Sequence, residues 1–413
     1  MLGDKNGETK LQSKYWGIFL KISICCPASF PATQFGGILF LGTDLAREFS
    51  NNGHEVTIYT TDLDFANNAH TFNRNLPKKE KFENFFIKRT HVYFSVFLFY
   101  LNLGMYFQMK NDEMDLIHTI GVRSFQSYVA ALISKKKNIP LVVSDQGGLT
   151  THPDLKSSNL FKKIIYKLQT PMIKFILNQS TKIIAANEYE KKIFSKFGVD
   201  DKVDIVKNGI NLDNIQNINV DFKNQYDIQK KYFLFLGRFS KVKGIDLLIK
   251  ALNEIKNEEK FKDFQLVLMG ADFGFQEEML SLISSFELQE KILVIKNPTR
   301  QDVLSAYKES EFLVLPSRWE LSPLTPLEGF MFGKPTISTN THGIPYTIEN
   351  NKNCLLVEPE NYQSLASAIM ELINNEKKCK KLGISGFELV NTECNSKKMA
   401  EKTLKIYEKI INR

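Results

Sequence analysis

The sequence predicts an α/β protein made of two Rossmann-like domains that face each other across a cleft. The chain has 413 residues, and a single hydrophobic core rarely serves so many. Short apolar runs alternate with helical patterns, which is typical of βαβ units with parallel strands. This alternation runs through the sequence twice, once in each half. We therefore expect two doubly wound sheets, with a ligand cleft outside the carboxyl ends of their strands.

The first half opens with the apolar run KISICCP at 21–27, which predicts a strand. A Gly36-Gly37 turn follows, and apolar residues then recur with helical spacing from 38 to 49. Asn52-Gly53 is expected to end this helix, and EVTIYTT at 55–61 predicts the next strand. Further strands are expected at 115–118, 141–144 and 182–185.

The second half repeats this plan. YFLFLGR at 232–238 predicts a strand, the next helix is expected to start near Ile245, and FQLVLMG at 264–270 predicts the returning strand. Further strands are expected at 291–297, 311–317 and 334–339.

The domain boundaries follow from this pattern. We expect a first domain over 15–210 and a second over 231–395. The stretch 211–230 is rich in Asn, Asp and Gln and is the natural linker. No strand follows the last helix, at 396–413, and we expect it to cross back to the first domain.

Composition narrows the function classes. Hydrophobic residues make up 43 % and charged residues 24 %, which is typical of a globular protein and excludes a fibrous or disordered one. The net charge of +8 suits an anionic substrate, an anionic membrane surface or nucleic acid. Nucleic acid is disfavoured, because the sequence contains no basic motif of a known nucleic-acid reader.

The five cysteines have neither metal-ligand spacing nor an even count for a disulfide framework. A reducing, cytoplasmic location is therefore expected. Lys21 interrupts the apolar run at 15–26, which argues against a signal peptide. The apolar run at 92–107 is too short to span a bilayer, so no transmembrane segment is predicted.

Two motifs, a glycine pair and a loop with two basic residues, each lie between a predicted strand and a predicted helix. Gly36-Gly37 would let a phosphate approach a helix N-terminus, although a bare turn explains the pair equally well. In GRFSKVKG, Arg238 and Lys243 could neutralise a diphosphate and the charge that grows on it during bond cleavage. The alternative is two solvated surface cations.

The segment ELSPLTPLE places two carboxylates, Glu320 and Glu328, around a strand-to-helix turn, where they could face different parts of one extended ligand. Glu328 has a second interpretation. Thr325-Pro326-Leu327-Glu328 matches a capping box with proline at the first helical position, which requires no ligand. Gly333 and Pro335 would then end the helix.

GRFSKVKG, followed some 75 residues later by two glutamates seven residues apart, resembles the retaining glycosyltransferases of family 4, the glycosyl transferases group 1. GHEV at 53–56, KNGIN at 207–211 and GKPTIST at 333–339 extend the resemblance over nearly the whole chain from about residue 20. It implies the GT-B fold, with the acceptor bound by the first domain and a nucleotide sugar by the second.

The resemblance also implies roles for matching residues. Arg238 and Lys243 would hold the donor diphosphate, Glu320 would contact the transferred sugar, and Glu328 would bind the ribose hydroxyls. Gly37 would touch the diphosphate from the first domain. Gly270 would leave room near the nucleotide. Backbone N–H groups of the segment from Leu321 to Leu324, which also contains Ser322 and Pro323, would meet the sugar and phosphate.

The acceptor side departs from the family pattern. Relatives often carry His-x-His after the fourth strand, whereas this chain has His118 followed by Thr119 and Ile120; relatives often carry His-Gly where this chain has Gln146-Gly147. A lone His118 is more often a core or supporting residue than a catalytic one. Asp62-Leu63-Asp64 spells a metal-binding Asp-x-Asp but is interpreted as a solvated loop, so no metal site is expected.

The sequence thus predicts a retaining, metal-independent transfer from a UDP- or GDP-linked sugar, with no further cofactor, to a glycan, lipid-linked or small-molecule acceptor. A nucleotide-sugar epimerase and a non-catalytic GT-B interaction protein are the alternatives. A basic amphipathic stretch at 159–177 predicts weak association with the inner membrane face. Its alternative is packing of the apolar face against the sheet. That face carries Leu160, Ile164, Ile165 and Leu168, beside Lys162, Lys163 and Lys167.

Overall fold

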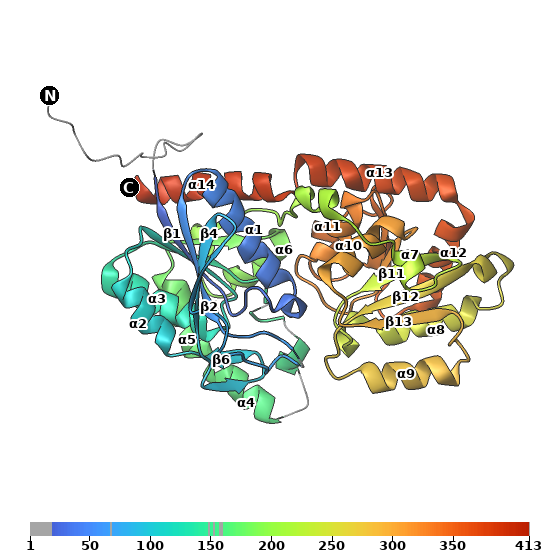
Figure 1. Ribbon diagram of the computed structural model, residues 1–413, viewed down its shortest axis with the longest axis horizontal. Helices are drawn as coiled ribbons and strands as arrows, with labels where there is room; N and C mark the ends of the chain where they lie inside the picture. Colours follow the sequence, from blue (N-terminus) through green and yellow to red (C-terminus); the bar gives the residue numbers. More distant parts are fainter. Residues whose placement is uncertain (1–18, 67, 148, 152, 157–159, 413) are drawn as a thin grey trace.

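The computed structural model describes residues 19–66, 68–147, 149–151, 153–156 and 160–412. Figure 1 shows two lobes side by side, each with its own sheet and its own covering helices. Within the described residues, no helix is long and apolar enough to cross a bilayer.

The first domain is built on an eight-stranded sheet, in which only β3 runs antiparallel to its neighbour. Its strand order is β10-β9-β8-β7-β1-β2-β4-β3. The central strands are apolar and buried, as expected of parallel strands covered by helices on both faces. The strands are β1 Lys21–Cys25, β2 Glu55–Thr61, β3 Lys79–Phe82, β4 Phe85–Thr90, β7 Leu116–Ile120, β8 Leu141–Ser144, β9 Lys182–Ala185 and β10 Val203–Ile205.

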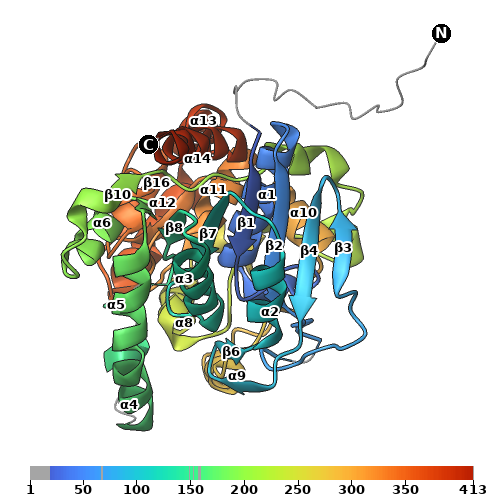
Figure 2. The same ribbon diagram turned by 90° about the vertical axis from the view of Figure 1, so that its left-hand side faces the viewer.

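The helices of this domain lie on both faces of the sheet (Figure 2). Outside the sheet, β5 Phe94–Val96 and β6 Phe99–Leu101 pair as an antiparallel hairpin. This hairpin takes up the apolar run that begins at residue 92. The helices are α1 Gly37–Asn51, α2 Gly104–Asn111, α3 Phe125–Lys137, α4 Leu160–Leu168, α5 Thr170–Gln179 and α6 Glu188–Ser195.

The second domain has a fully parallel six-stranded sheet of order β13-β12-β11-β14-β15-β16. The predicted strand at 264–270 and the predicted helix start at Ile245 are confirmed. Its strands are β11 Lys231–Leu236, β12 Phe264–Gly270, β13 Ile292–Lys296, β14 Leu313–Leu315, β15 Thr336–Thr339 and β16 Cys354–Val357; its helices are α7 Phe222–Gln225, α8 Ile245–Ile255, α9 Gln276–Ser285, α10 Arg300–Glu309, α11 Leu324–Met331, α12 Tyr362–Asn374 and α13 Glu376–Thr392.

Two segments join the domains. Between 211 and 230, Phe222 and Ile228 are buried in the core of the second sheet, so the later part of this stretch packs with the second domain. The last helix, α14 Ser396–Ile411, runs along the top of Figure 1 and lies on the first domain. There Ser396 Oγ donates to Glu48 at 2.6 Å, and the Tyr407 ring packs on Phe49.

Candidate functional site

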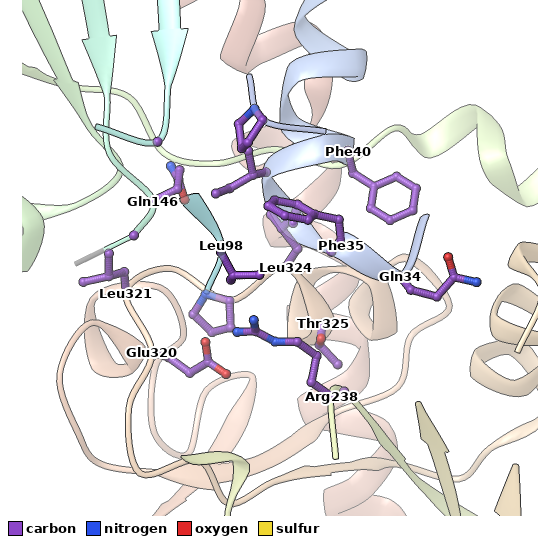
Figure 3. A pocket seen from close by; sticks show the side chains of 18 of the residues that line it. Gln34, Phe35, Phe40, Leu98, Gln146, Arg238, Glu320, Leu321, Leu324 and Thr325 are labelled. Atoms are coloured by element: carbon purple, nitrogen blue, oxygen red, sulfur yellow. The ribbon is translucent and has the colours of Figure 1, made fainter. Parts of the chain in front are cut away.

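A cavity of about 440 Å³ lies between the two domains and is lined from both sides (Figure 3). Its volume is within the range of small-molecule sites. The loops after β11, β12 and β14 form one wall, and the loops after β1, β7 and β8 form much of the other. Both sheets therefore present the carboxyl ends of their strands to the cavity, as predicted for open α/β sheets.

Arg238 and Lys243 lie on the second domain's wall, between β11 and α8. The Arg238 guanidinium lies 5.0 Å from the centre of the Phe273 ring. Phe65 of the first domain packs against Phe273 as well, with ring centres 5.8 Å apart. Phe273 thus holds the guanidinium in place on the cavity wall by a cation–π contact.

Glu320 is buried and pairs with Lys243. The Lys243 ammonium forms an ion pair with Glu320 Oε1, which also accepts a hydrogen bond from Ser317 Oγ at 3.0 Å. This pair joins two motifs that lie 77 residues apart in the sequence. A cation and a carboxylate therefore meet at one point of the wall.

Glu328 does not belong to a capping box, and that interpretation of the sequence is wrong. Helix α11 starts at Leu324 with Pro323 as its N-cap residue, so Thr325 and Glu328 lie inside the helix. The Glu328 carboxylate instead pairs with Arg300 at 2.7 Å and accepts the Tyr307 hydroxyl at 2.9 Å. Both partners come from α10, which sequence spacing could not connect with α11.

The glycines have different roles. Gly37 lines the cavity, and a Cβ atom there would meet Leu324 at an ordinary 3.5 Å. Gly36 before it has φ of +96°, a conformation that favours glycine. Gly270 also lines the cavity, but a Cβ atom there would come within 1.9 Å of the Gly237 carbonyl oxygen. Close approach of two backbone segments therefore already requires glycine at 270.

The segment from Leu321 to Leu324 lines the cavity and is held from the first domain. Asn187 Nδ2 donates to the Leu321 carbonyl at 2.8 Å, and Asn208 Nδ2 donates to the Ser322 carbonyl at 3.3 Å. Sequence reasoning selected neither asparagine. Asn187 lies in no recognisable motif, and Asn208 lies in KNGIN, where no role was assigned to it. Figure 3 shows Leu321 and Leu324 on either side of this part of the pocket.

His118 lies outside the residues that line the cavity. Its ring nitrogens contact the Tyr407 hydroxyl at 2.6 Å and Ser144 Oγ at 2.9 Å. Burial lowers the pKa of His118 to about 3, so the ring is neutral at physiological pH. These contacts favour the core interpretation, in which His118 anchors α14.

Asp62 is buried rather than solvated, which corrects part of the interpretation of Asp62-Leu63-Asp64. Its carboxylate lies 2.5 Å from His91 Nδ1 and accepts the Val92 N–H at 3.1 Å. Asp64 accepts the Ala66 N–H. Both carboxylates thus serve local structure.

The first domain's wall carries charged residues that sequence reasoning did not select. Arg123 and Asp145 line the cavity, beside Gln146. Glu190 lies behind them and accepts the N–H groups of Gln146 at 3.1 Å and Ala186 at 2.5 Å. Burial, and then the Asp145 charge, raise the pKa of Glu190 to about 7.

Two protein-family models match the chain. Residues 35–214 match "Glycosyltransferase Family 4", and residues 217–388 match "Glycosyl transferases group 1". Together they span both walls of the cavity.

The chain also resembles curated glycosyltransferases and solved structures. An uncharacterized glycosyltransferase of Methanocaldococcus jannaschii is 27 % identical, over 73 % of this chain and 77 % of the relative. An Escherichia coli UDP-Gal:alpha-D-GlcNAc-diphosphoundecaprenol alpha-1,3-galactosyltransferase is 23 % identical, over 70 % and 75 %. Anabaena HepE in complex with UDP-glucose superposes with a TM-score of 0.72 at 16 % identity, over 94 % of this chain and all of that one. At that identity, the superposition shows a common fold.

Proposed function

Since this chain belongs to the group 1, family 4 glycosyltransferases and has the GT-B fold, we propose that it transfers a sugar with net retention and without a metal ion. The donor is a nucleotide-diphosphate sugar, and the acceptor is a glycan, a lipid-linked molecule or a small molecule. One observation carries this proposal: Lys243 pairs with Glu320 in the cavity that Arg238 and Glu328 also line.

The residues of the cavity suggest how the transfer proceeds. Arg238 and Lys243 supply two positive charges where negative charge develops on the departing diphosphate. As that charge grows, Lys243 can turn from Glu320 to a phosphate oxygen, which leaves the carboxylate facing the transferred sugar. The acceptor hydroxyl then attacks from the side of the leaving group, and a donor phosphate oxygen accepts its proton. The domains enclose the reaction and exclude water that would hydrolyse the donor.

A uridine or guanosine nucleotide is the donor we propose. The HepE structure holds UDP-glucose, which supports the uridine form. Glu328 lines the cavity, and its carboxylate would accept the ribose hydroxyls. An epimerase would act on the donor alone, and a non-catalytic protein would not require the Lys243–Glu320 pair.

Weak contact with a membrane surface is a further part of this proposal. Ile164 and Leu168 on α4 are 50 % and 73 % exposed, so the alternative, packing of these side chains against the sheet, does not apply to them. Lys163 and Lys167 are exposed on the same helix. The side chains of Leu160 and Lys162 lie outside the described residues.

A panel of nucleotide sugars, screened by thermal shift, tests the donor. A ligand at about 100 times its dissociation constant adds about 2.7 kcal/mol of stability. The selected donor is then incubated with candidate acceptors, with and without EDTA, and the anomeric configuration of the product is read by NMR. Retained configuration with EDTA present is expected. Donor isomerisation without acceptor would identify an epimerase, and an inverted product would overturn the retaining mechanism.

Liposome flotation tests the membrane contact. We expect binding to anionic vesicles at low salt, weakened by the double substitution Ile164→Ser and Leu168→Ser and by raised salt. Absence of binding at low salt would exclude the contact and leave the proposed transfer untouched.

A further inference from the structure

One arm of the cavity is apolar. The β5–β6 hairpin contributes Val96, Phe97, Leu98 and Phe99, and α4 contributes Tyr166; we refer to these five residues as the apolar arm. Phe97 stacks on Tyr166, with ring centres 6.4 Å apart and ring planes at 12°. Leu98 lines the pocket while 40 % of it stays exposed, and Figure 3 shows it pointing into the pocket. A sugar ring can stack its C–H face on a single aromatic side chain, but it is too small and too polar to cover five adjacent apolar residues.

The apolar arm continues into exposed apolar side chains outside the cavity. Figures 1 and 2 both place α4 and β6 at the same end of the first domain. Tyr93 and Phe94, at the start of the hairpin, are 67 % and 60 % exposed, and Leu168 is 73 % exposed. These residues thus add exposed apolar side chains to the two elements that carry the apolar arm, and exposed apolar surface of this kind can mark a binding site. A bound molecule could therefore extend from the cavity along this surface.

A cation lies on the wall beside the apolar arm. The Arg123 guanidinium lies 5.3 Å from the Tyr166 ring centre, donates to Gln169 Oε1 at 3.0 Å and donates to the Leu149 carbonyl. Its Nε–H is buried and has no hydrogen-bond partner among the described residues. Arg123 itself lines the cavity, so an anionic ligand there could pair with the positive charge of its guanidinium.

We propose that the apolar arm and Arg123 bind the lipid-phosphate part of a lipid-linked acceptor. The hydrocarbon chain lies along the hairpin, a phosphate oxygen accepts from Arg123, and the sugar extends toward Glu320. This inference rests on the proposed transferase function and selects one of its acceptor classes. Asp145 also lines the cavity and interacts electrostatically with Arg123. Because its negative charge opposes a second anion, we expect the phosphate to strengthen binding by about tenfold, the lower end of the range for charged hydrogen bonds.

The test uses short soluble probes. The chain has two tryptophans, Trp16 and Trp319, and Trp319 lines the cavity. In a Trp16→Phe background, fluorescence of Trp319 reports the binding of farnesyl phosphate, farnesol or inorganic phosphate, each below its aggregation threshold. Affinity for the nucleotide chosen by the donor panel is measured on the same samples. We expect farnesyl phosphate to bind about tenfold more tightly than farnesol, and inorganic phosphate to bind more weakly than either.

Two variants separate the parts of the site. Arg123→Gln should reduce farnesyl phosphate affinity to that of farnesol, and Leu98→Ser should weaken both farnesyl probes several-fold. Their controls are Arg74→Gln, an exposed arginine away from the cavity, and Leu280→Ser, which is also 40 % exposed but lies on α9. Both controls should bind like the parent. If Arg123→Gln does not fold, the comparison of Leu98→Ser with Leu280→Ser still decides the hydrocarbon part.

Three results would overturn the inference. These are equal binding of inorganic phosphate and farnesyl phosphate, unchanged binding in both cavity variants, and no binding of any probe. In each case, intact nucleotide binding would leave the transferase proposal standing. Failure of the parent protein to bind any nucleotide would instead count against the transferase proposal itself.

Discussion

The two walls of the cavity differ in how their charged side chains are paired. On the second domain's wall, where we propose that the donor binds (the donor wall), Glu320 is paired with Lys243, and Glu328 with Arg300, by partners from the same domain. On the first domain's wall, where we propose that the acceptor binds (the acceptor wall), Arg123 and Asp145 lie beside the apolar arm. The buried Glu190 behind them accepts two backbone N–H groups. The donor wall therefore holds its carboxylates in ion pairs, whereas the acceptor wall combines a large apolar surface with a few charged groups. The same fold can thus keep its donor chemistry while its acceptor changes.

Removing a cation from the donor wall should have the largest effect. We expect Arg238→Ala and Lys243→Ala each to lower kcat by about 10²- to 10³-fold, because each stabilises charge that develops on the diphosphate. Steady-state kinetics check this. Lys241→Ala is the matched control, since Lys241 lies in the same turn but is 66 % exposed and pairs with Glu278. Normal turnover in both cavity variants would refute their role.

On the acceptor wall, the buried Glu190 should make stability depend on pH. Its pKa is raised from an ordinary 4.5 to about 7, so the folded state holds a proton that the unfolded state releases. The stabilisation is complete below about pH 4.5 and is lost as pH rises through 7, by up to about 3 kcal/mol. Urea unfolding between pH 5 and 8 should show this loss in the parent.

Glu190→Gln should remove most of that pH dependence, because glutamine does not titrate. Glu188→Gln on the same helix is the control, since Glu188 is exposed, and it should leave the profile unchanged. Parallel profiles for the parent and Glu190→Gln would show that other groups carry the pH dependence.

The sequence predicted more of the second domain's side of the cavity than of the first domain's side. Strand 264–270 and helix α8 could be predicted because hydrophobic periodicity is a local signal. Lys243 and Glu320 could be selected because they lie in compact motifs. The alternative interpretation of Glu328, as part of a capping box, was wrong because its contacts with Arg300 and Tyr307 join two helices and local spacing does not encode them.

The acceptor wall was largely missed for the same reason. Arg123 follows β7 and Asp145 follows β8, and nothing local marks either as part of a cavity. Only the parallel order of the sheet brings these loops together. The hairpin part of the apolar arm was noticed only as part of the apolar run at 92–107. Its position in the cavity depends on how the hairpin packs against α4.

Glu328 offers a smaller effect that tests the donor wall. Glu328→Gln keeps a hydrogen-bond acceptor for Tyr307 but loses the charge that pairs with Arg300 and that we propose binds the ribose. We expect donor affinity to fall by about 1 to 2 kcal/mol, the difference between charged and neutral hydrogen bonds. Calorimetry measures it, with melting temperature recorded alongside. A lower melting temperature with unchanged donor affinity would mean that Glu328 serves only to hold α10 against α11.

The smallest expected effect concerns the link between the walls. Asn187 caps α6 by accepting the Glu190 N–H at 2.9 Å, while its Nδ2 donates across the cleft to Leu321. Asn187→Ser separates these roles, since serine is also a good N-cap residue but cannot make the amide donation. Losing one hydrogen bond of about 1 kcal/mol should raise the donor KM about fivefold while the melting temperature stays nearly constant. Asn178→Ala, at an exposed position on α5, is the control and should change neither value. If Asn187→Ser melts lower but keeps the parent KM, the residue acts only as a cap, and the acceptor wall does not position the donor loop through it.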